Sequence, residues 1–335
     1  MTEIAPPLVV VDVGASGGVD LGWRALPNDA LVLAFEPDEE ECERLSRLAP
    51  GTSGPRVEYV PLALGRERTR APFYETHRAY CSSNLRPMQE MWERFPSLAA
   101  MALESVSEIE LVPLDEWCRD RGVNHIDFIK LDTQGSELDI LHGARQILNS
   151  TLIVEIEVEF NPLYENQPLF GDVDAHLRSR GFELWTLDSV NFCELAGSEG
   201  RSTPLVTEGA GHALSRLRPA GQLMWAQAFY VRGDLLRLDD GTALATKRTR
   251  AFALAQTRGL SDLADALALV AGLDPSPIPS STAIETDTEP SQSVEEIRAE
   301  LTRVREELQR IYASRSYRAT QPLRSLRSRL SRKRS

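Results

Sequence analysis

The sequence predicts an α/β fold built on a doubly wound, mostly parallel sheet. Short apolar runs alternate with amphipathic helical patterns from residue 8 to about residue 190. Most of these runs are continuously apolar, which is typical of parallel strands that are covered by helices on both faces. Repeated strand–helix–strand units of this kind indicate the doubly wound class. The runs expected to form buried strands are 8–11, 31–35, 57–64, 126–131 and 152–160.

The segments between these runs carry the signals of helix ends. The first expected helix begins at Asp38 and has Glu41 three residues on, close to a capping box. The last ends at Gly181, a residue well suited to a helix C-terminus. Helices are expected over 38–48, 136–148 and 172–180, and two further runs, 182–187 and 224–231, are expected to close the sheet.

The chain is expected to divide into a main domain and several C-terminal additions. We predict a main domain over 1–235, with a polar, Gly-rich loop over 197–211, and an Ala/Leu-rich extension of two helices over 236–273. The stretch 274–292 is rich in Pro, Ser, Thr and acids, the composition of a disordered linker. Two short segments of different character follow, 293–313 and 314–335.

Both of these last segments allow two interpretations. The first has a heptad seam, which predicts either a short coiled coil that self-associates or a monomeric solvated helix. The second carries eight cations and no acid, which predicts either a helix resting on an anionic membrane or a disordered solubilising tail. The heptad positions are Val294, Ile297, Leu301, Val304, Leu308 and Ile311, and the apolar face of the tail consists of Leu323, Leu326 and Leu330.

Composition and charge exclude several classes of protein. With 42% apolar and 26% charged residues, the chain has the composition of a soluble globular protein. The net charge is −13, but residues 293–335 carry +7 and the rest carries −20, so nucleic acid is not expected as a partner. No apolar run reaches the ~18 residues of a membrane span, and the run 8–11 is too short for a signal peptide. The four scattered cysteines predict reduced structural thiols and a cytoplasmic location, with the tail at the inner face of the membrane as an alternative.

A glycine-rich loop follows the first predicted strand and reads Asp12-Val13-Gly14-Ala15-Ser16-Gly17-Gly18. Small residues let the backbone turn tightly and approach a ligand at the carboxyl edge of the sheet. Asp12 either accepts hydrogen bonds from an ammonium group or orders the loop. The second strand ends in Phe35-Glu36-Pro37, where an acid can accept hydrogen bonds from both ribose hydroxyls of a nucleoside.

Two nucleoside-containing ligands use such a site, and the loop distinguishes them. A dinucleotide requires Gly-x-Gly-x-x-Gly, which places its pyrophosphate at a helix N-terminus. This loop lacks that register, and the following Val19-Asp20 adds an acid. The residues therefore favour S-adenosylmethionine, whose near end is a zwitterionic amino acid, over a nicotinamide dinucleotide.

Four motifs in a fixed order sharpen this prediction: 12–17, 34–38 (AFEPD), 61–65 (PLALG) and 127–137 (DFIKLDTQGSE). Together they resemble the FkbM family of class I methyltransferases, and the resemblance covers residues 8–232. It implies the seven-stranded class I methyltransferase sheet and methylation of sugar or polyketide hydroxyls. It also implies donor contacts at Asp12, Gly14, Gly17 and Glu36, with Leu62 and Ala63 beside the adenine.

Three further residues complete the candidate donor site. Ser16 lies within the glycine loop and Pro37 follows the ribose-binding acid. Ser83 belongs to the polar loop Tyr80-Cys81-Ser82-Ser83-Asn84, which either contacts the donor carboxylate or the acceptor, or is an ordinary turn. One departure from the family pattern is Gln134, which stands where many relatives have Glu.

Methyl transfer to a sugar hydroxyl benefits from a group that takes the hydroxyl proton. Asp132 closes the fourth predicted strand, and Glu157 lies in the fifth between Glu155 and Glu159, with all three facing one side. Asp132 and Glu157 are the candidate catalytic acids, although Asp132 can also cap the following turn. Glu159 is expected to be exposed where the strand emerges into solvent.

His142 is a third catalytic candidate, and its alternative is a surface histidine on a helix. Asp132 and Glu157 can also hold a divalent cation, but the sequence offers no third ligand and we predict no metal site. Aromatic residues in 161–164 and 167–170 suit the apolar face of a sugar ring, and packing at the surface explains them equally well.

The predicted function is an S-adenosylmethionine-dependent O-methyltransferase that acts on a carbohydrate-type acceptor: a surface polysaccharide, glycolipid or glycosylated metabolite. The basic segment 313–324 resembles C-terminal segments of bacterial surface-polysaccharide glycosyltransferases, which favours such an acceptor. One alternative is an NAD-dependent or nucleotide-sugar-modifying Rossmann enzyme, against which the absence of a Tyr-x-x-x-Lys pair counts. The other is a non-catalytic scaffold that recruits glycan-assembly partners through 293–313.

Overall fold

The computed structural model describes residues 6–48, 54–197, 221–237 and 244–273. The chain divides into two units, 1–281 and 282–335, and every described residue belongs to the first. Most of the loop predicted over 197–211 lies outside the described residues. So do the predicted linker, the heptad segment 293–313 and the basic tail 314–335, and the predicted coiled coil is therefore not confirmed.

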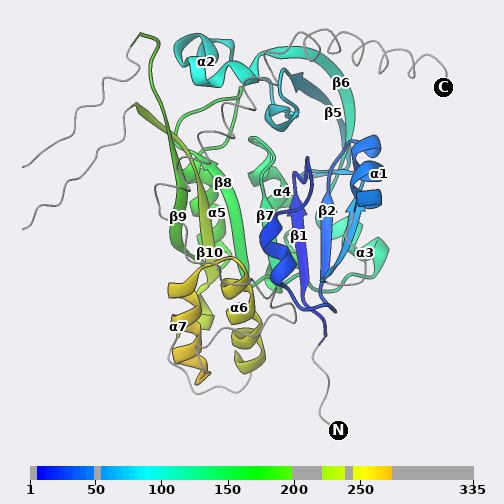
Figure 1. Cartoon of the computed structure of the whole chain (residues 1–335), viewed down its shortest axis with the longest axis vertical. Helices are drawn as coiled ribbons and strands as arrows, with labels where there is room; N and C mark the ends of the chain where they lie inside the picture. Colours follow the sequence, from blue (N-terminus) through cyan, green and yellow to red (C-terminus); the bar gives the residue numbers. More distant parts are fainter. Residues whose placement is uncertain (1–5, 49–53, 198–220, 238–243, 274–335) are drawn as a thin grey trace, which may run out of the picture. The chain divides into compact units, whose positions relative to one another are not determined.

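A seven-stranded sheet forms the centre of the fold, in the order β3-β2-β1-β7-β8-β10-β9 (Figure 1). Neighbouring strands are parallel, except that β10 runs antiparallel to both β8 and β9. This confirms the predicted doubly wound, mostly parallel sheet, which the runs predicted over 182–187 and 224–231 close as β9 and β10. Its strands are β1 (Val9–Val13), β2 (Leu31–Phe35), β3 (Arg56–Val60), β7 (Phe128–Leu131), β8 (Ile153–Glu159), β9 (Phe182–Cys193) and β10 (Gln222–Arg232).

A second, three-stranded sheet has the order β4-β6-β5 and was not predicted. The run predicted as one strand over 57–64 is two strands, because the chain turns at Pro61, where the Leu62 N–H bonds back to the Val60 carbonyl at 2.8 Å. In Figure 1 this insertion lies at the end of the central sheet toward which β1, β7 and β8 run. Its elements are β4 (Ala63–Leu64), β5 (Thr69–Thr76), η2 (Ala79–Cys81), α2 (Gln89–Arg94), η3 (Pro96–Met101) and β6 (Leu103–Val112).

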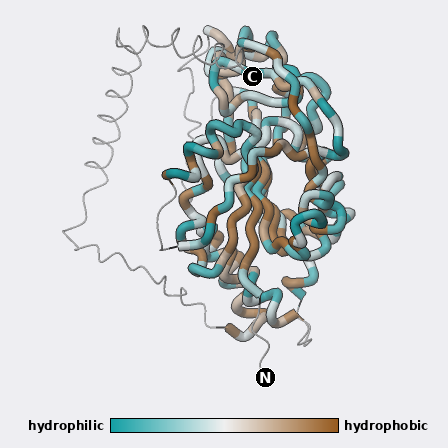
Figure 2. Tube along the Cα trace, turned by 90° about the vertical axis from the view of Figure 1, so that its right-hand side faces the viewer, coloured by the Kyte–Doolittle hydropathy of each residue, from teal (hydrophilic) through white to brown (hydrophobic). Residues whose placement is uncertain are grey.

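Helices cover both faces of the central sheet, and Figure 2 shows the apolar strands running between more polar helices. One face packs against α3 (Leu114–Arg121), α4 (Glu137–Gly143) and α5 (Phe170–Ser179). The opposite face packs against η1 (Leu21–Ala25), α6 (Ala245–Thr257) and α7 (Ser261–Ala271). The helical extension predicted over 236–273 therefore shares a core with β1, β7 and β10. The remaining helices are α1 (Glu39–Leu48), η4 (Ile147–Asn149) and η5 (Gly233–Leu236).

The helix predicted over 136–148 is shorter, because α4 ends at Gly143 and η4 follows after a break. Gly143 packs so closely on the insertion that a Cβ there would lie 2.1 Å from the Gly65 carbonyl oxygen. A third apolar cluster, which includes Phe95, Tyr164 and Met224, joins the insertion to the loop after β8 and to β10. Within the part of the chain that is described, no helix has the length and apolarity needed to cross a membrane.

The four cysteines are free and buried, as predicted. Burial raises the pKa of Cys42 and Cys81 to about 11 and that of Cys118 to about 12, so these thiols stay protonated at neutral pH.

Candidate active site

The glycine loop lies at the switch point of the sheet, between the carboxyl ends of β1 and β7, where open α/β sheets bind ligands. The N–H groups of Gly14 and Ala15 donate to the Phe35 carbonyl at 3.1 and 3.2 Å, which fixes the loop against the end of β2. Gly14 has φ +83°, and a Cβ there would lie 1.9 Å from the Asp132 carbonyl oxygen. Gly17 also has φ +83°, but a Cβ there would meet no atom within 4 Å. The loop is therefore tightly held at its base and open at its tip.

Asp12 lies beneath this loop, with 1% of its surface exposed. Its Oδ2 accepts hydrogen bonds from Trp23 Nε1 at 2.8 Å and from the Asp20 N–H at 3.1 Å, and its Oδ1 lies 3.4 Å from Lys130 Nζ. Of the two roles considered for Asp12, these contacts show the ordering of the loop. A direct contact between Asp12 and a donor ammonium stays a prediction.

Glu36 ends β2 beside the loop and is 7% exposed. Its Oε1 accepts a hydrogen bond from the Asp38 N–H at 3.0 Å. Burial, with the nearby charges of Asp38 and Glu41, raises the pKa of Glu36. A buried carboxylate that keeps one oxygen for further donors, next to an open glycine tip, fits the ribose of an adenosyl group.

The remaining predicted donor residues surround this end of the sheet. Ser16 is exposed at the loop tip, and Pro37 is half-buried directly after Glu36. Leu62 and Ala63 are half-buried at the turn between β3 and β4, where apolar side chains can line an adenine. Together these residues fit an adenosyl donor with an amino acid end.

Strand register places charged residues side by side across the sheet. Asp12 of β1 pairs with Lys130 of β7, and Lys130 pairs with Glu155 of β8. Asp132 and Glu157 lie two residues further along their strands, so they point to the same face and form the next row, nearer the carboxyl edge. Lys130 Nζ connects the two rows, because it lies 3.4 Å from Asp12 and 3.8 Å from Asp132.

Gln134 holds the two candidate catalytic acids together. Its Nε2 donates to Glu157 Oε2 at 2.7 Å and to Asp132 Oδ1 at 3.2 Å. Its Oε1 accepts a hydrogen bond from the Tyr164 hydroxyl at 3.1 Å. The backbone of Gln134 has φ +61°, a left-handed conformation that turns this side chain back toward the strand ends. The acids predicted from sequence are thus brought together by a residue that appeared there only as a departure from the family pattern.

Glu157 is 8% exposed, whereas the side chain of Asp132 is 33% exposed. Burial, and then the charges of Asp132, Glu159 and Glu137, raise the pKa of Glu157 well above its ordinary value, while Lys130 opposes this rise. Glu157 is therefore a carboxyl group with an unusually strong affinity for a proton.

Glu159 is not exposed, and the prediction that it emerges into solvent is wrong. It is 2% exposed, and β10 pairs with β8 as far as Glu159, opposite Trp225, so the strand does not emerge into solvent before this residue. Burial and the charges of Glu137 and Asp132 raise the pKa of Glu159 as well. Glu137 accepts hydrogen bonds from the N–H groups of Thr133 and Gly135 at 2.7 and 2.9 Å, so it fixes the turn that carries Gln134.

Ser83 comes from the insertion and is 1% exposed. Its Oγ donates to the Gln134 carbonyl at 2.8 Å and accepts from the Leu85 N–H at 3.0 Å. These contacts place Ser83 behind the Gln134 turn. Ser83 thereby connects the insertion to the row formed by Asp132 and Glu157, which we call the acidic row. A contact between Ser83 and the donor stays a prediction.

His142 is not brought to this group of acids. It lies on α4 with its ring 4.5 Å from the ring of His176 on α5, in an edge-on arrangement. Burial lowers the pKa of His142, and burial together with His142 lowers that of His176 to about 4. The pair packs two helices together outside the sheet, so we do not assign His142 a place at the acidic row.

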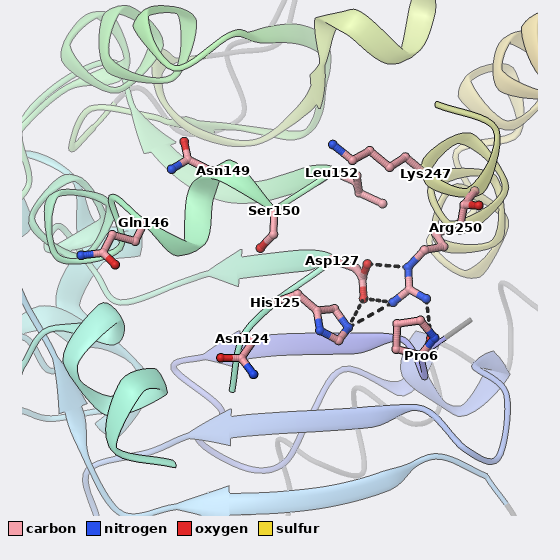
Figure 3. A pocket seen from close by; sticks show the side chains of 11 residues that line it. Pro6, Asn124, His125, Asp127, Gln146, Asn149, Ser150, Leu152, Lys247 and Arg250 are labelled. Atoms are coloured by element: carbon pink, nitrogen blue, oxygen red, sulfur yellow. Dashed lines mark hydrogen bonds and ion pairs between the residues drawn. The ribbon is translucent and has the colours of Figure 1, made fainter. Parts of the chain in front are cut away.

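A cavity of about 440 Å³ lies at the opposite, amino edge of the sheet, where β1, β7 and β8 begin (Figure 3). Arg250 of α6 spans it to Asp127, with Nε donating to Oδ1 at 2.7 Å, and Asp127 also lies 3.8 Å from His125. None of the predicted site residues lines this cavity, so it is separate from the candidate active site. Among the described residues, no group of three or more His, Cys, Asp or Glu could hold a metal ion.

Comparison with known proteins agrees with this arrangement. The family defined by the methyltransferase FkbM domain matches residues 12–184, which include the glycine loop, the Gln134 turn and all of β8. The chain belongs to the FkbM methyltransferase family. This FkbM protein is therefore an S-adenosylmethionine-dependent methyltransferase, as the resemblance of its four motifs predicted.

The FkbM protein is 26% identical over 176 residues to the 2-O-methyltransferase NoeI of Sinorhizobium fredii (strain NBRC 101917 / NGR234), across 48% of this chain and 68% of NoeI. Two solved structures also resemble it. One is magnesium protoporphyrin IX methyltransferase (ChlM) of Synechocystis PCC 6803 with bound S-adenosylmethionine, with 11% identity over 68% of this chain and 71% of that chain and a TM-score of 0.28. The other is a putative RNA methyltransferase of Pyrococcus horikoshii, with 13% identity over 67% of this chain and 74% of that chain and a TM-score of 0.29.

Proposed function

We propose that this methyltransferase transfers its methyl group to an oxygen, the hydroxyl of a carbohydrate-type acceptor. The observation that carries the proposal is Glu157, a buried carboxylate with a raised pKa in the acidic row beside the donor loop. A hydroxyl nucleophile must lose its proton as the new bond forms, and a carboxyl group with raised proton affinity is suited to accept it. The related protein NoeI is a 2-O-methyltransferase, which agrees with oxygen as the methylated atom.

In the proposed mechanism, Glu36 and the loop containing Gly14 and Gly17 hold the donor. When bound, S-adenosylmethionine supplies an electrophilic methyl group. Asp132 and Glu157 orient the acceptor hydroxyl, and a Glu157 oxygen takes the hydroxyl proton while the hydroxyl oxygen gains the methyl carbon. The bond between this carbon and the donor sulfur would break in the same step and leave a neutral thioether. Gln134 holds both carboxylates in place, which keeps the reacting atoms aligned without reorganisation.

The insertion is the segment proposed to contact the acceptor. Ser83 and Cys81 of the insertion bond to Gln134 and Tyr164, so this segment lies directly against the acidic row. Tyr164, the aromatic residue of 161–164, is fully buried and therefore not available to stack on a sugar, so the contact predicted for that segment is wrong. Tyr80 is 64% exposed in the same insertion and can cover the apolar face of a sugar ring.

Calorimetry with the full chain tests the donor site. S-adenosylmethionine is expected to bind with micromolar affinity, and Glu36→Ala is expected to weaken binding about tenfold or more (~1.4 kcal/mol). Unchanged binding by the variant would overturn the assignment of Glu36.

A second experiment tests the acceptor. Methyl-labelled donor is incubated with the full chain and matched sugars that carry either a hydroxyl or an amino group at the same carbon. Label on the hydroxyl sugar alone supports the proposal. Label on nitrogen, or labelling of non-carbohydrate hydroxyls alone, would overturn it while leaving the methyltransferase activity in place.

A further inference from the structure

The donor loop of this protein is supported by a residue that lies 74 positions beyond the region matched by the family. We propose that Arg258, at the C-terminal end of α6, is a positioning residue for this loop. The C-terminal helices would thus contribute to donor binding. This inference rests on the donor site proposed above.

Arg258 bridges two carboxylates that come from distant parts of the chain. Its Nη1 donates to Asp20 Oδ1, in the segment after the glycine loop, at 2.6 Å. Its Nε and Nη2 donate to the two oxygens of Glu155 in β8, each at 2.8 Å. The Arg258 side chain is only 10% exposed and that of Glu155 only 4%, so this two-pronged contact is shielded from water. Charge-assisted hydrogen bonds with this paired geometry are strong and directional.

The same guanidinium also contacts an aromatic ring that is hydrogen-bonded to Asp12. It lies 4.7 Å from the centroid of the Trp23 ring, and Trp23 Nε1 donates to Asp12 at 2.8 Å. Asp12 in turn accepts the N–H of Asp20. Arg258 thus contacts two groups, Asp20 and Trp23, that each bond to the acid beneath the glycine loop.

The fit around Arg258 is close. Gly22 follows Asp20, and a Cβ at Gly22 would lie 2.8 Å from Arg258 Nη1 and 3.0 Å from Asp20 Oδ1. The Gly22 N–H donates to the same Asp20 oxygen at 2.8 Å. The turn therefore leaves just enough room for the guanidinium and fixes the Asp20 carboxylate between two donors.

The simplest competing explanation is that Arg258 only fastens α6 to the sheet. The protein contains its own control, because Arg250 of the same helix binds Asp127 at the amino edge with a comparable two-pronged contact, at 2.7 and 2.5 Å (Figure 3). The Arg250 side chain is 13% exposed, close to the value for Arg258. Both arginines fasten α6, but only Arg258 contacts the segment that follows the donor loop.

The experiment compares full-length Arg258→Ala, Arg258→Lys and Arg250→Ala. Unfolding temperature, the Kd for S-adenosylmethionine, and the KM for the donor and kcat are measured for each. Both alanine variants are expected to lower the unfolding temperature, but only Arg258→Ala is expected to weaken donor binding and raise the donor KM, each about tenfold. Arg258→Lys is expected to recover part of the affinity, because an ammonium group keeps the charge but cannot bind both carboxylates in the same way.

A second variant keeps the test decisive if Arg258→Ala does not fold. Asp20→Ala removes the loop end of the bridge and leaves the pair between Arg258 and Glu155 intact. It is expected to weaken donor binding at least threefold in the native background and clearly less in an Arg258→Lys background, where the lysine keeps only part of the contact with Asp20. Equal losses in the two backgrounds would show that the residues act independently and would overturn the inference.

Two other results would also overturn it. One is a loss of donor affinity in Arg250→Ala as large as that in Arg258→Ala, which would indicate a purely structural role for both arginines. The other is native affinity for S-adenosylmethionine in Arg258→Ala together with a loss of affinity in Glu36→Ala. This result would support the donor site and exclude a positioning role for Arg258. Native affinity in Glu36→Ala would instead show that the donor site itself is wrongly placed.

Discussion

Two neighbouring rows of carboxylates cross the same face of the sheet, and they differ in what lies opposite them. In the row beneath the donor loop, Asp12 and Glu155 face Lys130, Arg258 and an indole N–H. In the row nearer the carboxyl edge, Glu157 is bonded to the neutral amide of Gln134 and lies among other acids. The acids beneath the donor loop thus lie beside cationic side chains, whereas Glu157 in the acidic row lies mostly among other acids.

The difference indicates that the acids of the two rows have different roles. Burial opposes ionisation of Asp20, but hydrogen bonds from Arg258 and the Gly22 N–H lower its pKa, so it holds a fixed negative charge. Asp20 is thus kept ionised by its partners, and burial raises the pKa of Glu155 although Arg258 and Lys130 oppose the rise. Burial also raises the pKa of Glu157, the proposed proton acceptor, which lies among other acids that raise its pKa further.

The largest expected effect is the loss of the proton acceptor in Glu157→Gln. We expect kcat to fall about 10²- to 10⁴-fold, the usual range for removal of a general base. The affinity for S-adenosylmethionine should stay within about twofold, because Asp12 and Glu155 beneath the donor loop keep all their partners. The matched control is Glu159→Gln, two residues on and on the same face, which should lose less than about tenfold. Equal losses in steady-state assays of the two variants would contradict the role of Glu157.

The donor loop offers the next test, a comparison of two glycines with the same φ. Gly14→Ala adds both left-handed strain and a collision with the Asp132 carbonyl, and should cost about 3 kcal/mol of the free energy of unfolding. Gly17→Ala adds the strain alone and should cost about 1 kcal/mol. Urea unfolding measures both, and equal costs would show that the base of the loop is not packed as described.

Sequence predicted the features that depend on local pattern. The strand 31–35 was predicted with the ends that the structure shows, because a continuous apolar run between polar residues has one simple explanation. The shared face of Glu155 and Glu157 followed from the two-residue period of a strand, and the glycine loop followed from its composition. All of these depend on a few consecutive residues.

Features that depend on distant residues were missed. β6 is mostly exposed, and its five apolar residues are scattered among Glu and Ser, so it lacks the continuous apolar run that predicts a buried strand. Glu159 lies within a strand that stays paired to its end, and the residue that pairs with it, Trp225 of β10, is 66 positions away. The partners of Arg258 lie 103 and 238 positions away, and no local pattern distinguishes it from the other arginines of α6. Gln134 was visible as an unusual residue, but only its backbone turn shows which groups its amide reaches.

A smaller effect is expected when the acidic row is made more acidic. Gln134→Glu removes the amide donor from Glu157 and adds a negative charge beside it, so the pKa of Glu157 should rise further. Activity should require ionised Glu157, and we expect the rising limb of the kcat–pH profile to move about one pH unit upward, with about tenfold lower activity below it. Gln134→Met, which removes the hydrogen bonds without adding charge, should move the limb less. Identical profiles for both variants would show that charge at this position has no influence on Glu157.

The smallest effect concerns stability, and here the two rows should respond in opposite directions. Because the pKa of Glu157 is raised in the folded state, its favourable contribution is complete below pH 4.5 and is lost as the pH rises through its folded pKa. Glu157→Gln removes this loss, so its Tm should match the native protein near pH 4.5 and exceed it at pH 8 by about 2–4 °C, equivalent to about 1 kcal/mol.

Glu155→Gln is the matched change in the other row. It leaves the buried guanidinium of Arg258 without its paired carboxylate, so its Tm should fall at pH 8. Calorimetric scans of both variants from pH 4.5 to pH 8 measure the two trends. If both variants moved in the same direction at pH 8, cation matching would not be what distinguishes the two rows.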